Sequence, residues 1–174
     1  MINAKPSPNS IALAGEFATL SQLALRGYDA NLTLGNTKNV DILVSDPESG
    51  RMYRVEVKTS RYLSKKGSAG KHSKLFGYNY EWIMIKKHED IVDSSLFYCF
   101  VNFAGKEGTS FRFFIVPSRV VAKYVGAQHQ LWLDQDPKHK DTAMRMFRLA
   151  LEEDGHPLPT PAAKRYESNW SFKR

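Results

Sequence analysis

The sequence predicts a single α/β domain in which a central mixed β-sheet is flanked by helices. Several short runs alternate apolar and polar side chains, one amphipathic segment precedes them, and further helical segments follow. The chain has 174 residues, of which 42% are hydrophobic, so it can bury a core without disulfides. We expect one domain over residues 1–156 and an extended, proline-containing basic arm over residues 157–174.

The first predicted element is a helix over residues 11–26. Ser10 precedes it as an N-cap, and Gly27 stands at the position where a helix stops. At 100° per residue, an apolar stripe that we expect to face the core is formed by Leu13, Phe17, Leu20 and Ala24. Glu16 lies about 60° from the centre of this stripe. The side chain of Glu16 is therefore expected to point partly toward the core.

Three strands are predicted next, over residues 28–34, 40–45 and 51–58. Turn-forming residues separate the last two, so these form an antiparallel hairpin centred on Glu48. Paired positions then add to about 96 or 97, which places Asp41 opposite Val55 or Glu56. Since alternate side chains share a face, Asp41, Glu56 and Lys58 are expected together at one end of the hairpin.

The second half of the chain predicts further strands and helices. Four aromatic residues at a spacing of two, residues 76–82, form either a half-buried strand, which we favour, or a stacking platform for unpaired bases. Two more strands are expected over residues 96–102 and 110–116. Helices are expected from Pro117 to about Gly126 and over residues 141–154.

The net charge is +7, and its position along the chain is informative. Residues 51–87 contain ten Lys or Arg against two acids, so the whole excess lies in this window. Such a local basic field attracts a polyanion, and nucleic acid is favoured over a membrane because no basic amphipathic helix accompanies it. No apolar run approaches the ~20 residues that span a bilayer, and the N-terminal residues lack a signal sequence. We expect a cytoplasmic protein whose only cysteine, Cys99, is buried.

Two acids and a lysine at adjacent strand ends can be explained by the chemistry of a metal site. Two carboxylates ~4 Å apart repel by about 4 kcal/mol at an effective dielectric constant of ~20. A divalent cation offsets this repulsion, since Mg²⁺ binds carboxylate oxygens together with waters and substrate phosphate. The cation activates a bound water, and Lys58 beside it positions that water or stabilises the charge on phosphate.

This pattern resembles the PD-(D/E)XK nuclease superfamily, which has the restriction-endonuclease-like fold. The matching residues are Asp41 in "NVDILV" and Glu56, Val57 and Lys58 in "VEVKTS". Upstream, "AGEFATLSQLALRGYDA" is similar to the first helix of the Holliday-junction-resolvase-like branch, whose glutamate Glu16 matches. The resemblance covers residues 10–60 best. It implies DNA hydrolysis with Mg²⁺, replaceable by Mn²⁺, which would be bound by Asp41, Glu56, the carbonyl of Val57 and Glu16.

Basic residues that follow the hairpin are expected to hold the DNA backbone over the metal. They are Arg61, Lys65, Lys66, Lys71, His72 and Lys74. The alternative interpretation of His72 is an ordinary surface histidine that does not contact DNA. Because the chain has no separate recognition domain, reading both strands of a duplex calls for a homodimer or a partner protein.

Other interpretations of the same residues remain open. The alternation in "VEVK" also fits an ordinary strand with one face in solvent. The chain could be a non-catalytic nucleic-acid-binding module that keeps the fold and the basic loop. It could also be an interaction subunit whose proline-rich tail docks another protein.

Overall fold

The computed structural model describes residues 6–33, 39–61, 75–104, 110–151 and 158–172. Its main sheet has five strands in the order β1–β2–β3–β5–β6. They are β1 (Asp29–Leu32), β2 (Ile42–Ser45), β3 (Met52–Ser60), β5 (Leu96–Ala104) and β6 (Ser110–Pro117). Neighbouring strands are antiparallel except β3 and β5, which are parallel. The sheet is therefore mixed, as predicted.

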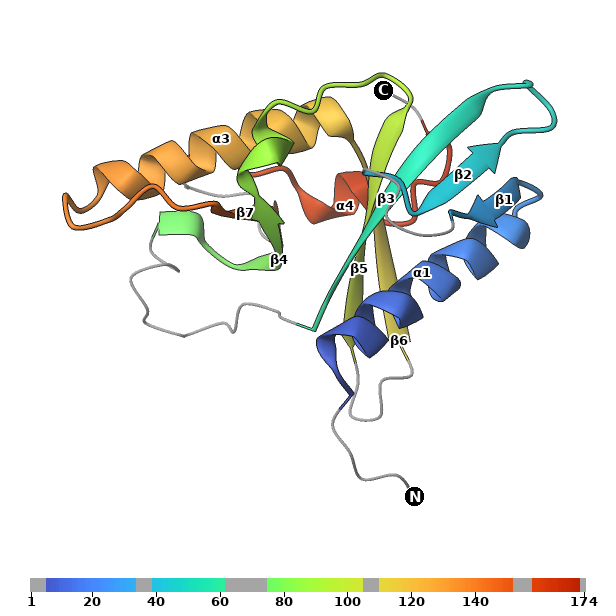
Figure 1. Ribbon diagram of the computed structural model, residues 1–174, viewed down its shortest axis with the longest axis horizontal. Helices are drawn as coiled ribbons and strands as arrows, with labels where there is room; N and C mark the ends of the chain where they lie inside the picture. The colour runs from blue at the N-terminus through green and yellow to red at the C-terminus, as the bar shows by residue number, and fades with distance from the viewer. Residues whose placement is uncertain (1–5, 34–38, 62–74, 105–109, 152–157, 173–174) are drawn as a thin grey trace.

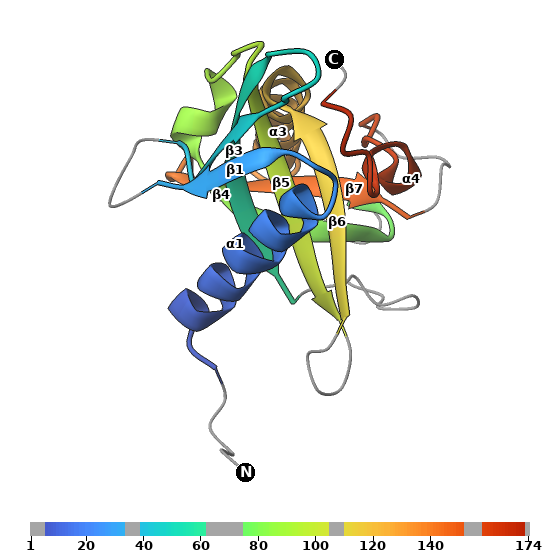
Figure 2. The same cartoon turned by 90° about the vertical axis from the view of Figure 1, so that its right-hand side faces the viewer.

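Helices and a second sheet cover the two faces of the main sheet (Figures 1 and 2). Helix α1 (Pro8–Ala24) crosses one face. Helix α3 (Ser118–Asp134) lies on the other side, with a two-stranded antiparallel sheet of β4 (Asn79–Ile85) and β7 (Met144–Ala150). Two short helices, η1 (Lys86–Glu89) and α4 (Ala163–Tyr166), complete the described elements. This confirms an α/β fold with a central mixed sheet flanked by helices.

The hydrophobic core is divided between the two faces of the sheet. Because successive strand residues point to opposite faces, β5 sends Phe97 and Cys99 toward α1 and Tyr98 and Phe100 toward α3. Cys99 is fully buried, as predicted, and burial raises the pKa of its thiol to about 12. Val57 belongs to the α1 side of the core. Its neighbours along β3 consequently point to the opposite face of the sheet.

The buried face of α1 differs from the predicted apolar stripe. Its buried residues are Gly15, Thr19 and Leu23, whereas Leu13 and Phe17 are 50% and 53% exposed. The prediction was wrong because the helix backbone approaches β3 so closely that only a small side chain fits. A Cβ atom at Gly15 would lie 1.9 Å from the Thr59 hydroxyl oxygen. The helix also begins earlier than predicted, with Ser7 rather than Ser10 as the N-cap.

Residues 144–150 of the helix predicted over 141–154 form strand β7 instead, and residues 152–154 lie outside the described residues. Strand β4 lies outside the main sheet, so its backbone groups need another partner, and β7 supplies one along its whole length. Phe147 stacks on Phe100 with ring centroids 4.3 Å apart, and Arg145 is 2% exposed and paired with Glu89 and Asp141. Tertiary pairing therefore overrides the local helical pattern. Helix α3, conversely, continues beyond Gly126 to Asp134.

The aromatic alternation in residues 76–82 leads into strand β4, which begins at Asn79, and is not a stacking platform. Phe76, Tyr80 and Trp82 are at most 3% exposed. The Trp82 indole N–H donates to the carbonyl of Val101 at 3.0 Å, which ties β4 to the main sheet. These rings belong to the core and present no face for unpaired bases.

The C-terminal segment packs on the domain. Where an extended arm was expected, the chain forms the helical turn α4 and then buries Trp170 and Phe172, which are 6% and 4% exposed. Phe172 stacks on Tyr53, and the Tyr28 hydroxyl donates to the Trp170 carbonyl at 2.9 Å. A docking role for this segment would have to use its other side chains. The predicted boundary between residues 156 and 157 lies outside the described residues.

Candidate active site

The hairpin of β2 and β3 positions Asp41. Ile42 pairs with Val55, and the same register continued by one step places Asp41 opposite Glu56, as predicted. The Asp41 N–H donates to the Val55 carbonyl at 2.9 Å. Its carboxylate oxygen Oδ2 accepts from the N–H of Val57 at 2.6 Å. Strand pairing and this second bond therefore fix the acid against the triplet of residues 56–58.

Glu56 and Lys58 lie on the same face of β3 and form an ion pair. The Lys58 Nζ is 2.6 Å from Oε1 of Glu56. Glu56 is 4% exposed, while the Lys58 side chain is 30% exposed. The other carboxylate oxygen of Glu56, Oε2, is buried and has no hydrogen-bond partner among the described residues. A buried carboxylate oxygen without a partner is costly, so this atom is a natural ligand for a cation.

Two residues that the sequence analysis did not select surround Glu56. The Tyr98 hydroxyl hydrogen-bonds to Glu56, and Nδ1 of His88 lies 2.8 Å from the same hydroxyl. Burial and the cations of Lys58 and Lys87 lower the pKa of His88 to about 4, so this ring is neutral at pH 7. A tyrosine that donates to the carboxylate leaves its oxygen to accept from Nδ1–H of His88. The pair thereby holds Glu56 in place.

The sequence alone did not identify Tyr98 or His88, and the fold explains why. Tyr98 reaches Glu56 because β3 and β5 pair in parallel, with Glu56 beside Tyr98, and no local pattern encodes this register. His88 lies among charged residues in the short helix η1, a sequence setting typical of a surface, yet it is 2% exposed. The only sequence feature that could have pointed to Tyr98 was the predominantly apolar run of β5 around it.

Glu16 lies on α1 close enough to Asp41 and Lys58 for their charges to act on it. Burial raises the pKa of Glu16, the Asp41 carboxylate raises it further, and Lys58 lowers it. Burial also raises the pKa of Asp41, and nearby Glu56 adds to this rise, while the Val57 N–H and Lys58 oppose it. The structure thus brings Glu16, Asp41, Glu56 and Lys58 into one electrostatic neighbourhood. Burial, rather than repulsion between the acids, is the largest cause of the raised pKa of both Glu16 and Asp41.

The residues present fit a bound divalent cation in donor chemistry. Within the described ranges, no three His, Cys, Asp or Glu side chains are already arranged around a common ion position. Mg²⁺ needs only one or two carboxylates together with waters and phosphate oxygens. Asp41 and Glu56 can supply these, and the free Oε2 of Glu56 is the atom best placed to do so. Here Lys58 provides the positive charge beside Glu56.

Most of the predicted DNA-binding loop lies outside the described residues. This holds for Lys65, Lys66, Lys71, His72 and Lys74. Arg61 is described and exposed at the end of β3, where its guanidinium lies 5.5 Å from the centre of the Phe103 ring. Its side chain is therefore available near the strand that carries Glu56 and Lys58.

The fold and the hairpin define an α/β protein with a central mixed sheet and a cluster of acids beside a lysine. Among solved structures, the chain is similar to a bacterial homing endonuclease, I-Ssp6803I, with a TM-score of 0.51 and 14% sequence identity. The match covers 95% of this chain and 90% of that one. At this identity the likeness shows the fold. The sequence matches no protein-family model and no curated protein. No helix among the described residues is long and apolar enough to cross a membrane.

Proposed function

We propose that the protein is a Mg²⁺-dependent deoxyribonuclease of the PD-(D/E)XK kind that hydrolyses phosphodiester bonds in DNA, most simply as an endonuclease. The observation that carries the proposal is the convergence of Asp41, Glu56 and Lys58 on adjacent strands. The fold shared with a homing endonuclease supports it. The buried, unpartnered oxygen of Glu56 adds a specific reason to place a cation there.

Each residue has a distinct role in this proposal. The carboxylates of Asp41 and Glu56 and the carbonyl of Val57 would hold Mg²⁺ or Mn²⁺, with Glu16 as a further contact. Bound there, the cation would supply an activated water and neutralise charge on the phosphate. The ammonium group of Lys58, which is partly exposed, would position the attacking water or stabilise the same charge. Arg61 and the basic residues after it would hold the phosphate backbone.

A plasmid-nicking assay with Mg²⁺ or Mn²⁺ tests the proposal. Wild-type protein is expected to convert supercoiled plasmid to nicked or linear forms, and Lys58→Ala to lose at least about 100-fold in rate, as expected for a lost catalytic group. Lys138→Ala removes an exposed lysine from the segment after α3, outside the candidate site, and is expected to cleave normally. Cleavage that persists in Lys58→Ala would refute the assigned site. No cleavage by any form, across several DNA structures, would refute the activity.

One observation favours a second candidate, a nucleic-acid-binding module without catalysis. The ion pair between Lys58 and Glu56 neutralises this acid without a metal. Such a module would bind DNA with a strong dependence on salt and none on divalent ions. The nuclease would bind or process DNA differently when Mg²⁺ is added. Fluorescence anisotropy with a labelled duplex, in EDTA and in Mg²⁺, separates the two.

Cleavage of both strands of a duplex leads us to propose a homodimer, or a complex with a partner protein. Two copies would present two sites to the two antiparallel strands. Leu13 and Phe17 form an apolar surface on α1 that the described residues leave about half exposed. Sedimentation analysis of the wild type and of Phe17→Glu, with and without DNA, would measure whether this surface joins two copies.

A further inference from the structure

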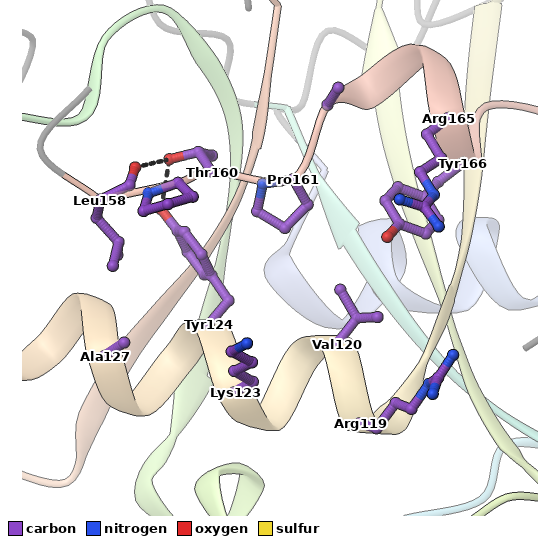
Figure 3. A pocket seen from close by; sticks show the side chains of 12 residues that line it. Arg119, Val120, Lys123, Tyr124, Ala127, Leu158, Thr160, Pro161, Arg165 and Tyr166 are labelled. Carbon is purple, nitrogen blue, oxygen red and sulfur yellow. Dashed lines mark hydrogen bonds between the residues drawn. The ribbon is translucent and has the colours of Figure 1, made fainter. Parts of the chain in front are cut away.

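A hollow of about 640 Å³ lies between α3 and the C-terminal segment (Figure 3). It is distinct from the candidate active site, because none of its lining residues belongs to that site. Helix α4 lies beside β6, whereas Asp41 lies at β2, near the other end of the strand order. The lining residues are Arg119, Val120, Lys123, Tyr124, Ala127, Leu158, Pro159, Thr160, Pro161, Ala162, Arg165 and Tyr166.

The charged residues of this hollow are all cations. Arg119, Lys123 and Arg165 line it and are exposed, and no acidic residue does. Within the described part of the chain, none of the three side chains has a carboxylate partner. A smaller neighbouring hollow of about 210 Å³ is also lined by Arg119 and Arg165, so the two hollows share these two residues. Three cations that have no carboxylate partner among the described residues, all lining one hollow, favour an anionic ligand.

The other end of the hollow is more apolar. In Figure 3, Arg119, Arg165 and Tyr166 lie at one end, Lys123 lies beside Tyr124, and Ala127 and Leu158 lie toward the other end. Tyr124 is 4% exposed, and its hydroxyl lies 3.5 Å from that of Thr160, which fixes the ring. A ligand that fits has a negative group at one end and a flat or apolar group at the other.

We propose that this hollow binds a nucleotide unit. The phosphate would lie between Arg119 and Arg165, whose planar guanidinium groups suit bidentate bonds to phosphate oxygens. The base would lie toward Tyr124 and Leu158. The volume falls in the range of small-ligand sites, roughly 300–1,000 Å³. The nucleotide could be free or part of a single strand. This inference goes beyond the proposed nuclease function and requires neither the divalent cation nor cleavage.

Binding is tested on the full chain in EDTA, where the proposed nuclease site is inactive. Amide NMR shifts of α3 are followed during titration with dAMP, deoxyadenosine or inorganic phosphate. We expect dAMP to shift residues around Tyr124 and Arg119 and to bind at least about tenfold more tightly than either fragment, because it uses both ends of the hollow. Equal binding of a fragment, shifts elsewhere, or tighter binding of an acidic peptide would overturn the proposal.

Variants separate the hollow from the general basic charge of the protein. The pair Arg119→Gln and Arg165→Gln is expected to weaken dAMP binding at least about tenfold. The matched pair Lys138→Gln and Lys140→Gln removes the same charge from exposed sites outside the hollow and is expected to change nothing. Ala127→Trp fills the apolar end and keeps all three cations. It should abolish the preference for dAMP over phosphate, with circular dichroism confirming the fold.

A further titration distinguishes the two sources of the nucleotide. If pentathymidylate shifts the same α3 amides as tightly as dAMP or more so, the hollow takes a nucleotide of a single strand. If dAMP binds and pentathymidylate does not, it takes a free nucleotide. If neither binds there, or if the arginine variants bind dAMP like wild type, the proposal fails whatever the result of the nicking assay.

Discussion

The backbone N–H of Val57 donates to the carboxylate of Asp41 across the β2–β3 hairpin, with a separation of 2.6 Å. Val57 lies between Glu56 and Lys58, so this bond holds Asp41 against both residues of the triplet. The Asp41 N–H is also bonded, to the Val55 carbonyl. The position of the acid is therefore set by the backbone of the hairpin before any cation binds. This is preorganisation of the kind that a metal site requires.

Replacing Asp41 separates its structural from its chemical role. Asp41→Ala removes the acceptor for the Val57 N–H, whereas Asp41→Asn keeps an oxygen that can accept. We expect Asp41→Ala to lower the free energy of unfolding by about 1–3 kcal/mol relative to Asp41→Asn. Both variants should lose nicking activity. Urea denaturation in EDTA measures the difference, and equal stabilities would show that the bond to Val57 contributes nothing.

Glu16 gives a prediction about pH. Burial and the charge of Asp41 raise its pKa in the folded state, so the folded protein holds this proton more tightly than the unfolded chain. The resulting stabilisation is complete below the unfolded pKa near 4.5 and is lost as pH rises through the folded value. In EDTA at pH 7, Glu16→Gln should therefore raise the melting temperature. The gain in the free energy of unfolding should be less than about 1 kcal/mol, because the group is partly exposed.

The same measurement at pH 4 should show little or no gain for Glu16→Gln. Added Mg²⁺ should stabilise the wild type more than the variant. Glu48→Gln, in the exposed hairpin turn, serves as the control and should show neither effect. A gain at pH 7 that is just as large at pH 4 would contradict the cause assigned to the raised pKa.

Tyr98 is predicted to position Glu56. Its hydroxyl bonds to Glu56 and to Nδ1 of His88 in a buried setting. Tyr98→Phe should reduce the free energy of unfolding by about 1–2 kcal/mol and weaken Mn²⁺ binding measured by calorimetry. Tyr53→Phe removes a hydroxyl with no hydrogen-bond partner among the described residues and is the matched control. If the two variants bind Mn²⁺ equally well, Tyr98 does not position a metal ligand.

The contact between α1 and β3 at Gly15 predicts a steric effect. Gly15→Ala would place a Cβ atom 1.9 Å from the Thr59 hydroxyl oxygen, so the helix must shift or Thr59 must turn. We expect a loss of about 1–3 kcal/mol in stability. Thr59→Ala removes that oxygen and should restore part of the loss in the double variant. Additive effects of the two substitutions in thermal denaturation would contradict a direct clash.

The β2–β3 hairpin was predictable because local patterns and tertiary structure agree there. The turn centred on Glu48 sets the hairpin register, and that register brings Asp41 to Glu56. The distal half was harder. The segment containing Arg145 and Phe147 reads as a helix, yet it pairs with β4, more than fifty residues earlier in the chain. The need of β4 for a pairing partner is apparent only in the complete fold.

The candidate site shows the same division between local and distant information. Residues 41, 56 and 58 follow from one hairpin. Tyr98 and His88 reach Glu56 through a parallel strand pair and a short helix, which no short-range pattern specifies. The prediction that the apolar stripe on α1 is buried was wrong for a different reason. A helix that packs on a sheet through Gly15 and Thr19 buries its small residues and leaves Leu13 and Phe17 in solvent.

The most direct test of a cation held by the hairpin is a crystal of the wild-type protein soaked in Mn²⁺ and measured at the manganese absorption edge. The account predicts an anomalous peak about 2.0–2.3 Å from carboxylate oxygens of both Asp41 and Glu56, with Lys58 moved away from Glu56. The peak should be absent from Glu56→Gln crystals treated in the same way. Strong density for Mn²⁺ elsewhere in the wild type, with Lys58 still paired to Glu56, would contradict it.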